Sequence, residues 1–524
     1  MPSTQLLWFK RDLRLQDHAA LHAACEAPAL LPIFCIEPSL WQAEDASPRQ
    51  FAFVREGLQS LDAALRLRGS RLCVLHGEVV AMLELLWQQC RFTQLLSHQE
   101  TGNAISYARD LAVADWCRSR GVVWQEFTQD GVVRRLRSRD GWAARWAERM
   151  AGEPLPPPET LPPWPPLDLS RLPRPEAWYS AFLQADPCTR QPGGRAAAEA
   201  TLESFLATRS ERYRGGISSP NLAEQACSRL SPHLAWGLVS MREVVSAVRA
   251  RRAVLQTMPE AGRPPRILSG LAAFEARLHW HCHFMQKLES EPAIEHHNML
   301  RSFDGMREEA FNREHFERWC AGETGYPLID ACMRKLQATG WLNFRMRAML
   351  VSFAAFPLWL HWREPGLHLA RLFVDYEPGI HWSQMQMQSG TTGINALRIY
   401  NPVKQARDQD PQGRFVRHWL PALAQVPDDY IFEPWLMPES LQVRVGCRIG
   451  RDYPAPIVAF EQATREAKAR LAEYRRLDET HQGARAVLEK HGSRKSGLRQ
   501  SGAAARETRR KRRSAEDGAQ LELL

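Results

Sequence analysis

The first residues with recognisable chemistry are Tyr213 and the run Cys-Ser-Arg-Leu-Ser at 227–231. Ser231 precedes Pro232 and an amphipathic stretch, which predicts a helix with Ser231 at its N-cap and Pro232 at its first position. The amides of such a helix start attract anions, and the hydroxyls of Ser228, Ser231 and Tyr213 would add donors. Taken alone, the pattern is that of a well-capped helix, and phosphate binding is the less favoured interpretation.

Two other chemical patterns have simpler explanations. His279 and His283 stand four residues apart, a spacing that can bind a metal on one helix face. No third ligand is spaced with them, so a packing or surface role is favoured and we predict no metal site. The 18 tryptophans suggest base stacking, but in a large helical core most of them would be packing residues. We assign only Trp280 and Trp382 to function.

The composition excludes several classes of protein. No stretch approaches the ~18 apolar residues of a membrane-spanning helix, and the N-terminus MPSTQLLWFKRDLRLQDH carries charges where a secretion signal needs an apolar core. The eleven cysteines are scattered, without the close pairs of zinc or iron–sulfur sites. We therefore expect a cytoplasmic protein with reduced thiols.

The positive charge is concentrated at the C-terminal end. The chain carries +9, and residues 494–524 hold nine Lys and Arg against four acids, which leaves a mildly basic body. The run TRRKRR can contact phosphates, but a solvated, disordered tail over 485–524 is the favoured interpretation.

The elements that must position these residues differ along the chain. Residues 1–130 alternate between apolar runs of strand length and helix-like stretches such as 48–66 and 104–120. The expected strands are 6–9, 30–36, 72–75, 95–97 and 122–124. This rhythm predicts an α/β fold, a doubly wound parallel sheet with helices on both faces. No GxGxxG follows the first strand, so nothing indicates the usual dinucleotide fingerprint.

A proline-rich segment divides the chain. Ten of the 35 prolines fall within 154–175, and such a run is extended rather than helical, which is typical of a semi-rigid connector. We therefore expect an α/β domain over 1–150, a linker over 151–185 and an all-helical domain over 186–477.

Six sequence motifs, taken together and in their order along the chain, resemble those of the DNA photolyase/cryptochrome family. They are WFKRDLRLQDHAAL (8–21), the S-R-L-S run, GETGYPLIDACMR, TGWLNFRMR, LRIYNP and RDYPAPIV (451–458). The match spans roughly residues 5–470. It implies an N-terminal α/β domain that accommodates an antenna pigment (folate or deazaflavin) and a C-terminal helical domain that encloses U-shaped FAD.

The resemblance also implies a flavin site. The positions matched to the FAD pyrophosphate and ribityl chain are Tyr213, Cys227, Ser228, Arg229, Leu230 and Ser231, with Cys227 where threonine is usual. Arg347 and Asp375 match the Arg–Asp pair beside the flavin ring; a buried pair keeps both groups ionised. Tyr376 and Glu377 follow that aspartate, and Glu377 matches an acidic position at the ring edge.

His381 falls where asparagine usually faces flavin N5, and a histidine there can exchange a proton near pH 7. Of the three tryptophans that usually pass electrons to the flavin, only the middle one is present, as Trp362; the others read Met385 and Glu309. Trp382 and Tyr400 are the substitutes nearest in sequence. The residues expected to carry the photochemistry are Arg347, Asp375, His381 and Trp362.

The substrate side departs from the family pattern. Arg277 replaces a glutamate that hydrogen-bonds cyclobutane dimers, and Phe344 and Ala348 replace both an Asn–Met pair and the paired histidines of (6-4) photolyases. One lesion-flanking tryptophan remains as Trp280, and the other is Met387. The positions matched to the DNA side are Arg277, Trp280, Phe344, Arg345, Met387, Arg398 and Gln405.

Two functions therefore compete. The first is a lyase that uses blue light and FAD to split a pyrimidine dimer in DNA, and it is slightly favoured because repair is the commoner role in the family. It would be a monomer that binds damaged DNA and no membrane. The second is a cryptochrome-type photoreceptor that acts on a protein partner. A light-independent scaffold is less favoured, because the flavin-side motifs are largely intact.

Overall fold

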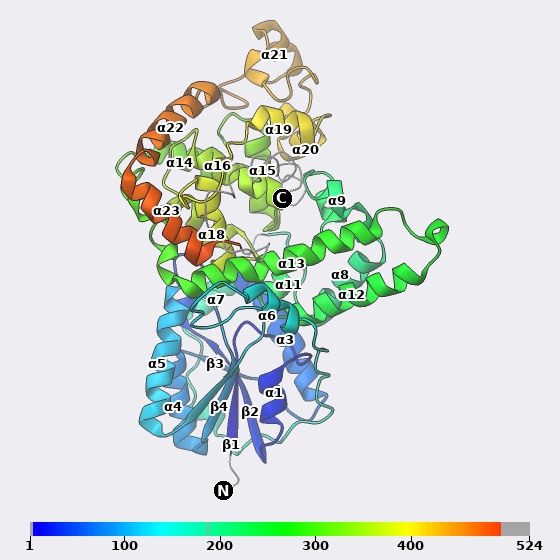
Figure 1. The fold of residues 1–524 in the computed structure, drawn as a ribbon, viewed down its shortest axis with the longest axis vertical. Helices are drawn as coiled ribbons and strands as arrows, with labels where there is room; N and C mark the ends of the chain where they lie inside the picture. The colour runs from blue at the N-terminus through cyan, green and yellow to red at the C-terminus, as the bar shows by residue number, and fades with distance from the viewer. Residues whose placement is uncertain (1–3, 186–187, 494–524) are drawn as a thin grey trace, which may run out of the picture.

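The computed structural model describes residues 4–185 and 188–493, in an α/β part and a larger helical part (Figure 1). The strands are β1 (Thr4–Phe9), β2 (Ala29–Ile36), β3 (Cys73–His76), β4 (Gln94–His98) and β5 (Val123–Phe127). They form one parallel sheet of order β3-β2-β1-β4-β5. The fold class and all five strands predicted from the sequence are confirmed.

The alternation of side chains along β1 explains why helices cover both faces. Leu7 and Phe9 pack into one core with α1 (Ala19–Ala24) and α3 (Pro48–Arg66). Leu6 and Trp8 point to the opposite face and pack against α4 (Val79–Cys90) and α5 (Ala104–Arg120). A strand buried on both faces has no polar alternation, which is why it appears in the sequence as a continuous apolar run. The other helices of this part are α2 (Pro38–Trp41) and α6 (Trp142–Arg149).

The helices that border the carboxyl edge of the sheet have defined starts. Ser47 and Gln50 form a capping box at α3, with Pro48 in the first turn. Asn103 caps α5 by accepting a hydrogen bond from the Ser106 amide, and the helix ends at Gly121, whose φ is 69°.

The proline-rich segment packs on the α/β part. It is non-helical apart from a 3₁₀ turn, η1 (Leu169–Arg171). The Leu30 amide donates to the Pro163 carbonyl at 3.0 Å, the Leu161 amide donates to the Arg68 carbonyl at 2.9 Å, and Leu161 is buried. The extended backbone was expected; the segment differs from a free spacer because its apolar residues have a core to join.

The rest of the described chain is helical, with α13 and α18 side by side at its centre. Gly379 makes this close packing possible, because a Cβ there would lie 2.8 Å from the Met285 Cα. The helices are α7 (Ala177–Gln184), α8 (Arg195–Ala207), α9 (Tyr213–Gly216), α10 (Ala223–Ala226), α11 (Ser231–Ala235), α12 (Met241–Thr257), α13 (Ile267–Ser290), α14 (Arg313–Ala321), α15 (Pro327–Thr339), α16 (Phe344–Ala355), α17 (Arg363–Leu372), α18 (Pro378–Ser389), α19 (Pro402–Gln409), α20 (Arg414–Trp419), α21 (Glu439–Val445), α22 (Phe460–Arg475) and α23 (Asp478–His491).

The disorder predicted from residue 485 onward is wrong for 485–491, which belong to α23. Asp478 and Glu479 lie in its first turn and Lys490 and His491 in its last, which suits the helix dipole. Val487 is buried in a core with Leu300 and Phe303. The basic run of the tail lies outside the described residues. Among the helices that the structure describes, none is long and apolar enough to span a bilayer.

Candidate functional site

The helical part encloses a cavity of about 770 Å³. Its wall comes from the segment around α9–α11, from α13, α16 and α18, from residues 394–398 and from the end of α23. The sequence-predicted residues that line it are Tyr213, Cys227, Ser228, Arg229, Ser231, Arg277, Trp280, Phe344, Arg347, Asp375, Glu377, Met387 and Arg398. Segments from 213 to 398 therefore meet around one space.

Arg347 and Asp375 form a bidentate ion pair in the cavity wall. Arg347 Nη1 and Nη2 donate to Asp375 Oδ1 and Oδ2 at 3.0 and 2.7 Å, and Nε donates to the Leu342 carbonyl at 2.6 Å. The guanidinium lies 3.9 Å from the Phe373 ring centroid. The Asp375 side chain is 3% exposed and that of Arg347 is 24% exposed. Such a fork fixes both the position and the direction of the two charges.

The run 227–231 is held open as a loop. Arg229 has a left-handed backbone with φ of 61°, which costs a non-glycine residue some strain. Its guanidinium lies 3.9 Å from the Trp341 ring centroid, and its Nε donates to Gln191 Oε1 at 3.1 Å. Arg209 donates to the carbonyls of Cys227 and Ser228. This bracing leaves the polar face of the loop directed to the cavity.

The predicted N-cap at Ser231 is wrong. Leu230 occupies the N-cap position, Ser231 is the first helical residue, and α11 has only five residues. The pattern of Ser before Pro misplaces the cap because proline is tolerated throughout the first turn. A helix this short offers little dipole, so any anion here must be bound by side chains. Leu230 is fully buried and does not line the cavity.

Arg277 lies on the same side of the cavity as Tyr213. Burial lowers the pKa of Arg277, and the Tyr213 hydroxyl, to which it is hydrogen-bonded, partly offsets this effect. Burial raises the pKa of Cys227 to about 12, so its thiol stays protonated. The sequence assigned Arg277 to the lesion; its position beside Tyr213 also suits the phosphate side of a bound dinucleotide.

His281 is a site residue that the sequence interpretation missed. Its Nε2 lies 2.8 Å from Glu377 Oε2, and the two side chains are 15% and 11% exposed. Burial alone would lower the pKa of His281, but the Glu377 carboxylate holds it well above its usual value. The cavity wall therefore contains a second ion pair. The helical period counted from Arg277 would have placed His281 on the same face of α13.

Asn343, at the N-cap of α16, was also missed. Its Nδ2 donates to the carbonyls of Ile217 and Ser218 at 3.0 and 3.2 Å, while its buried Oδ1 has no hydrogen-bond partner among the described residues. A buried acceptor without a partner is costly unless a ligand supplies the donor. Together with the volume and the paired charges, this unsatisfied atom fits the polar groups of FAD.

Several predicted residues lie outside the cavity wall: Leu230, Trp362, Tyr376, His381, Arg345 and Gln405. His381 is turned away. Its Nε2 shares a hydrogen bond with the Gly366 carbonyl at 2.9 Å, and burial lowers its pKa to about 4. Ile380 lines the cavity instead. The sequence predicts that His381 faces the cavity and exchanges a proton near pH 7. The structure turns this side chain away, because one step along a helix rotates the side-chain direction by about 100°.

Tyr376 points toward the α/β part, where its hydroxyl donates to Asp45 Oδ2 at 2.7 Å. Arg345 and Gln405 are joined by a 3.5 Å hydrogen bond from Arg345 Nη1 to Gln405 Oε1. These two residues come from the starts of α16 and α19 and form a polar contact outside the cavity wall.

Trp382 on α18 and Trp362 at the N-cap of α17 form a pair outside the cavity wall. The Trp362 and Trp382 ring centroids are 5.7 Å apart, and Trp382 is 4.9 Å from the His381 ring. Trp362 Nε1 donates to Asn298 Oδ1 at 2.7 Å. Both tryptophans are fully buried, and His361 lies 5.1 Å from Trp362 on the outer side. Trp382, one of the two candidates from the sequence, therefore does contact Trp362.

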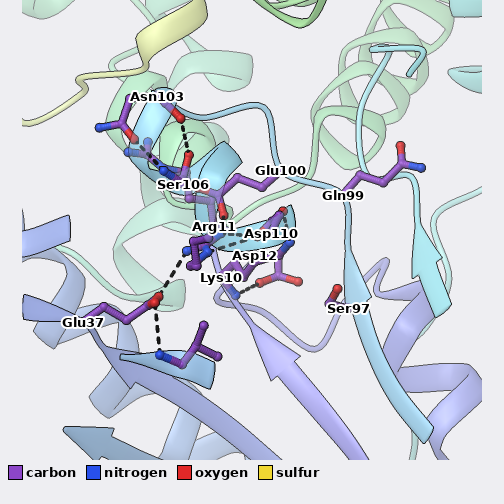
Figure 2. A network of polar contacts seen from close by, with 12 residues as sticks. Lys10, Arg11, Asp12, Glu37, Ser97, Gln99, Glu100, Asn103, Ser106 and Asp110 are labelled. Carbon is purple, nitrogen blue, oxygen red and sulfur yellow. Dashed lines mark hydrogen bonds and ion pairs between the residues drawn. The ribbon is translucent and has the colours of Figure 1, made fainter. Parts of the chain in front are cut away.

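The carboxyl edge of the sheet has a different character (Figure 2). Arg109 contacts Glu37, Glu100 and Asp110 at 3.2, 2.6 and 2.8 Å. Lys10 also contacts Asp110, at 3.2 Å. The cavity here has about 80 Å³, room for about three water molecules.

Asp12, His18 and His98 form a cluster below this network. His98 Nδ1 and His18 Nε2 lie 2.8 and 3.1 Å from Asp12 Oδ2. Burial lowers the pKa of both histidines, that of His98 to about 3, so they are neutral donors to the carboxylate. The His18 Nδ1 accepts from the Leu21 amide, which caps α1. The cluster is explained by these hydrogen bonds.

Comparison with known proteins identifies the chain. A family model described as DNA photolyase matches residues 5–155, and one described as FAD binding domain of DNA photolyase matches residues 274–473. The chain is 31% identical over 505 residues to the deoxyribodipyrimidine photo-lyase of Streptomyces griseus, covering 91% of this chain and all of the relative. It is 27% identical to the (6-4)DNA photolyase of Arabidopsis thaliana, covering 92% and 90%.

Cryptochromes are similar to a comparable degree. The cryptochrome DASH of Gloeobacter violaceus is 29% identical, covering 88% of this chain and 94% of the relative. Among solved structures, a class III photolyase from Agrobacterium tumefaciens superposes with a TM-score of 0.76 at 26% identity, covering 91% of this chain and 98% of the other. The chain belongs to the DNA photolyase/cryptochrome family. It is a photolyase-like flavoprotein whose cofactor is FAD.

Proposed function

We propose that this flavoprotein is a lyase that uses blue light to split a pyrimidine lesion in DNA. The observation that supports this is the continuity of the cavity: it extends from the Arg347–Asp375 pair to Trp280, Met387 and Arg398. A cavity that reaches from the charged pair to an aromatic residue, Trp280, suits a base that has been flipped from the DNA. We further propose that the protein acts as a monomer in the cytoplasm, where its eleven free cysteines stay reduced.

Different polar residues of the cavity would bind different parts of FAD. Tyr213, Ser228 and Arg229 would hold the pyrophosphate, with Arg277 as an additional cation. Arg347 and Asp375 would place fixed, opposite charges beside the flavin ring, and His281 with Glu377 would add a second such pair. Bound FAD supplies light absorption and the transfer of one electron. The protein's part is to orient the ring and exclude water, which strengthens each of these charge interactions.

The outer part of the cavity would receive the lesion. Trp280 offers a stacking surface, and Phe344 and Met387 make the adjoining wall apolar. Arg398 in the wall, and Arg345 with Gln405 outside it, would contact phosphates and orient the strand. Because Arg277 replaces a carboxylate and an arginine accepts no hydrogen bonds, we propose that cyclobutane dimers in duplex DNA are poor substrates.

The test is light-dependent repair by the FAD-loaded, reduced protein. Cyclobutane and (6-4) lesions in single- and double-stranded oligonucleotides are illuminated with blue light, and restored pyrimidines are quantified by chromatography. Repair of at least one lesion, absent in darkness, is expected. Efficient repair of duplex cyclobutane dimers would refute the proposed preference, and no repair of any lesion at full FAD occupancy would refute the lyase function.

A photoreceptor function is favoured by one observation: the end of α23 lines the cavity through Leu488, His491, Gly492 and Ser493. A C-terminal segment against the flavin cavity suits a protein that reports the flavin state to a partner. In that case, illumination without DNA should change the rate at which a protease cleaves near residue 490. An unchanged rate would argue against signalling.

We also propose that Trp382 and Trp362 deliver electrons to the flavin, since their rings are in contact and lead toward His361. Trp382→Phe should slow photoreduction of bound FAD about tenfold, whereas Trp419→Phe, a change far along the chain in α20, should not. Wild-type photoreduction kinetics in Trp382→Phe would exclude this route.

A further inference from the structure

Lys287 is a buried lysine that faces the cavity without a counter-charge. It lies on α13, is 4% exposed and lines the cavity wall. Within the described residues, its Nζ has no hydrogen bond or ion pair; it lies 5.2 Å from the Phe284 ring centroid. Burial, reinforced by Arg139, lowers the pKa of Lys287 to about 8, so the ammonium still predominates at neutral pH.

The other buried lysines of the described residues are paired. Lys335 Nζ lies 2.7 Å from Glu224 Oε1, and Lys10 Nζ lies 3.2 Å from Asp110 Oδ2. Removing an ammonium from water carries a large free-energy cost that an anionic partner must offset. At Lys287 this partner is not supplied by the described protein groups. The cost of burying the Lys287 ammonium is explained if a bound ligand supplies the anionic partner.

His283, one turn before Lys287, offers a second donor. Arg139 donates to His283 Nδ1, so the proton of the neutral imidazole is on Nε2. Burial lowers the pKa of His283 far below its usual range, and the charges that add to this effect are all basic: Lys287, Arg139, His279 and His491. Glu291 lies 2.7 Å from His491 Nε2 and pairs with that residue, so the positive charge beside His283 comes from Lys287 and Arg139.

The geometry relates these donors to the stacking residue. Trp280, His283, Phe284 and Lys287 are spaced i, i+3, i+4 and i+7 and share one face of α13. Trp280 and His283 rings are 4.9 Å apart. Seven residues advance a helix by about 10 Å, and side chains lean back toward the N-terminus. A base stacked on Trp280 would thus have its phosphate within reach of Lys287.

We infer that Lys287 and the Nε2–H of His283 form a phosphate subsite for the DNA strand that carries the flipped base. This inference rests on the proposed function, because it assumes that DNA enters the cavity. The FAD pyrophosphate is a separate anion, since Tyr213 and Arg277 define its side and Arg277 lies ten residues, about 15 Å, from Lys287 along α13. The subsite makes Lys287 a substrate-positioning residue.

The first experiment measures binding of a lesion-containing single-stranded oligonucleotide to the FAD-loaded protein as a function of salt. Lys287→Gln should weaken binding about tenfold and reduce the slope of log affinity against log salt by about 0.7, the value for one phosphate contact on a single strand. Lys468→Gln, which removes an exposed lysine on α22, should change neither. Lys287→Arg should keep the slope. A wild-type slope and affinity in Lys287→Gln would overturn the subsite.

The second experiment separates this inference from the proposed function. Inorganic phosphate is titrated into the FAD-loaded protein without DNA, and binding is followed by phosphorus NMR. Phosphate binding that is lost in Lys287→Gln but kept in Lys468→Gln supports the subsite even if no lesion is repaired. Equal phosphate binding in the wild type and Lys287→Gln overturns it even if repair is efficient. FAD occupancy measured in each variant shows that the protein is folded.

Discussion

The carboxyl edge of the sheet and the helical cavity both bury many charges, but they balance them differently. At the sheet edge four basic residues meet four acids: Lys10, Arg11, Arg109 and Arg134 with Glu37, Glu100, Asp110 and Glu126. Figure 2 shows Lys10 and Arg11 among Glu37, Glu100 and Asp110. In the cavity, Arg347 and His281 have acidic partners, whereas Lys287 has none among the described residues.

This difference separates buried charges that stabilise the fold from buried charges that lack a partner until a ligand binds. A buried network with complete pairing is satisfied by the protein itself, and its cavity is accordingly small. A buried cation facing a large cavity without a carboxylate is a cost to the folded state that a bound anion removes. Substitutions in the first region should therefore change stability, and substitutions in the second should change ligand affinity.

The largest expected effect is that of Asp375→Asn on FAD. The amide leaves Arg347 without its bidentate partner at the proposed flavin position, and loss of one partner of a buried pair costs about 3 kcal/mol. FAD affinity should therefore fall about a hundredfold, measured by fluorescence titration of the apoprotein. Asp452→Asn, which breaks the exposed pair with Arg451, is the control and should bind FAD normally. Full FAD retention by Asp375→Asn would place the pair away from the ring.

The second prediction concerns Arg109→Met at the sheet edge. Three carboxylates would lose their shared cation, and the expected cost is about 3 kcal/mol in the free energy of unfolding. FAD affinity should not change, since the network lies in the α/β part. Urea denaturation and FAD titration measure the two quantities. Arg118→Met removes an exposed pair with Asp115 and should leave both unchanged. Reduced FAD affinity with normal stability would contradict the division of roles.

The sequence predicts the α/β part well, because its signals are local. Each buried strand is a short apolar run, and α3 and α5 begin at Pro48 and after Asn103. The two helices are therefore found with their exact bounds, and the strands with ends that differ by up to three residues. The Arg347–Asp375 pair follows from the family motifs, although 28 residues separate its members.

The remaining site residues depend on tertiary packing. His281 meets Glu377 only because α13 lies on α18, and no local signal specifies that contact. His381 has the residue type for proton exchange, but its position on α18 turns it to the Gly366 carbonyl. The polar composition of 485–491 indicates disorder, yet Val487 finds a core supplied by Leu300 and Phe303. Sequence patterns identify elements; the faces that the elements present to each other decide which side chains meet.

The third prediction is a gain in stability. Lys287→Met removes an unpaired buried ammonium and keeps most of the volume, so the free energy of unfolding should rise by about 1 kcal/mol, measured by urea denaturation at pH 7. Lys335→Met provides the contrast, because Glu224 would lose its partner and stability should not rise. A loss of stability in Lys287→Met would mean that the ammonium is satisfied within the protein and that the cavity needs no anion there.

The smallest effect is expected from Glu37→Gln, and its sign depends on pH. Burial raises the pKa of Glu37 to about 7, despite Arg109 and a hydrogen bond from the Val79 amide, both of which oppose this shift. Between pH 4.5 and 7 the folded protein thus keeps a proton that the unfolded chain has released, so this residue's contribution to stability falls as pH rises through that window.

Glutamine is neutral throughout and lacks this loss. The variant should melt about 2 °C above the wild type at pH 8 and close to it at pH 5, whereas the exposed change Glu26→Gln should leave melting unchanged at both. A lower melting temperature for Glu37→Gln at pH 8 would show that the ionised carboxylate is needed by Arg109. All four carboxylates of the sheet edge would then be ionised and paired, and its contrast with the cavity would be greater still.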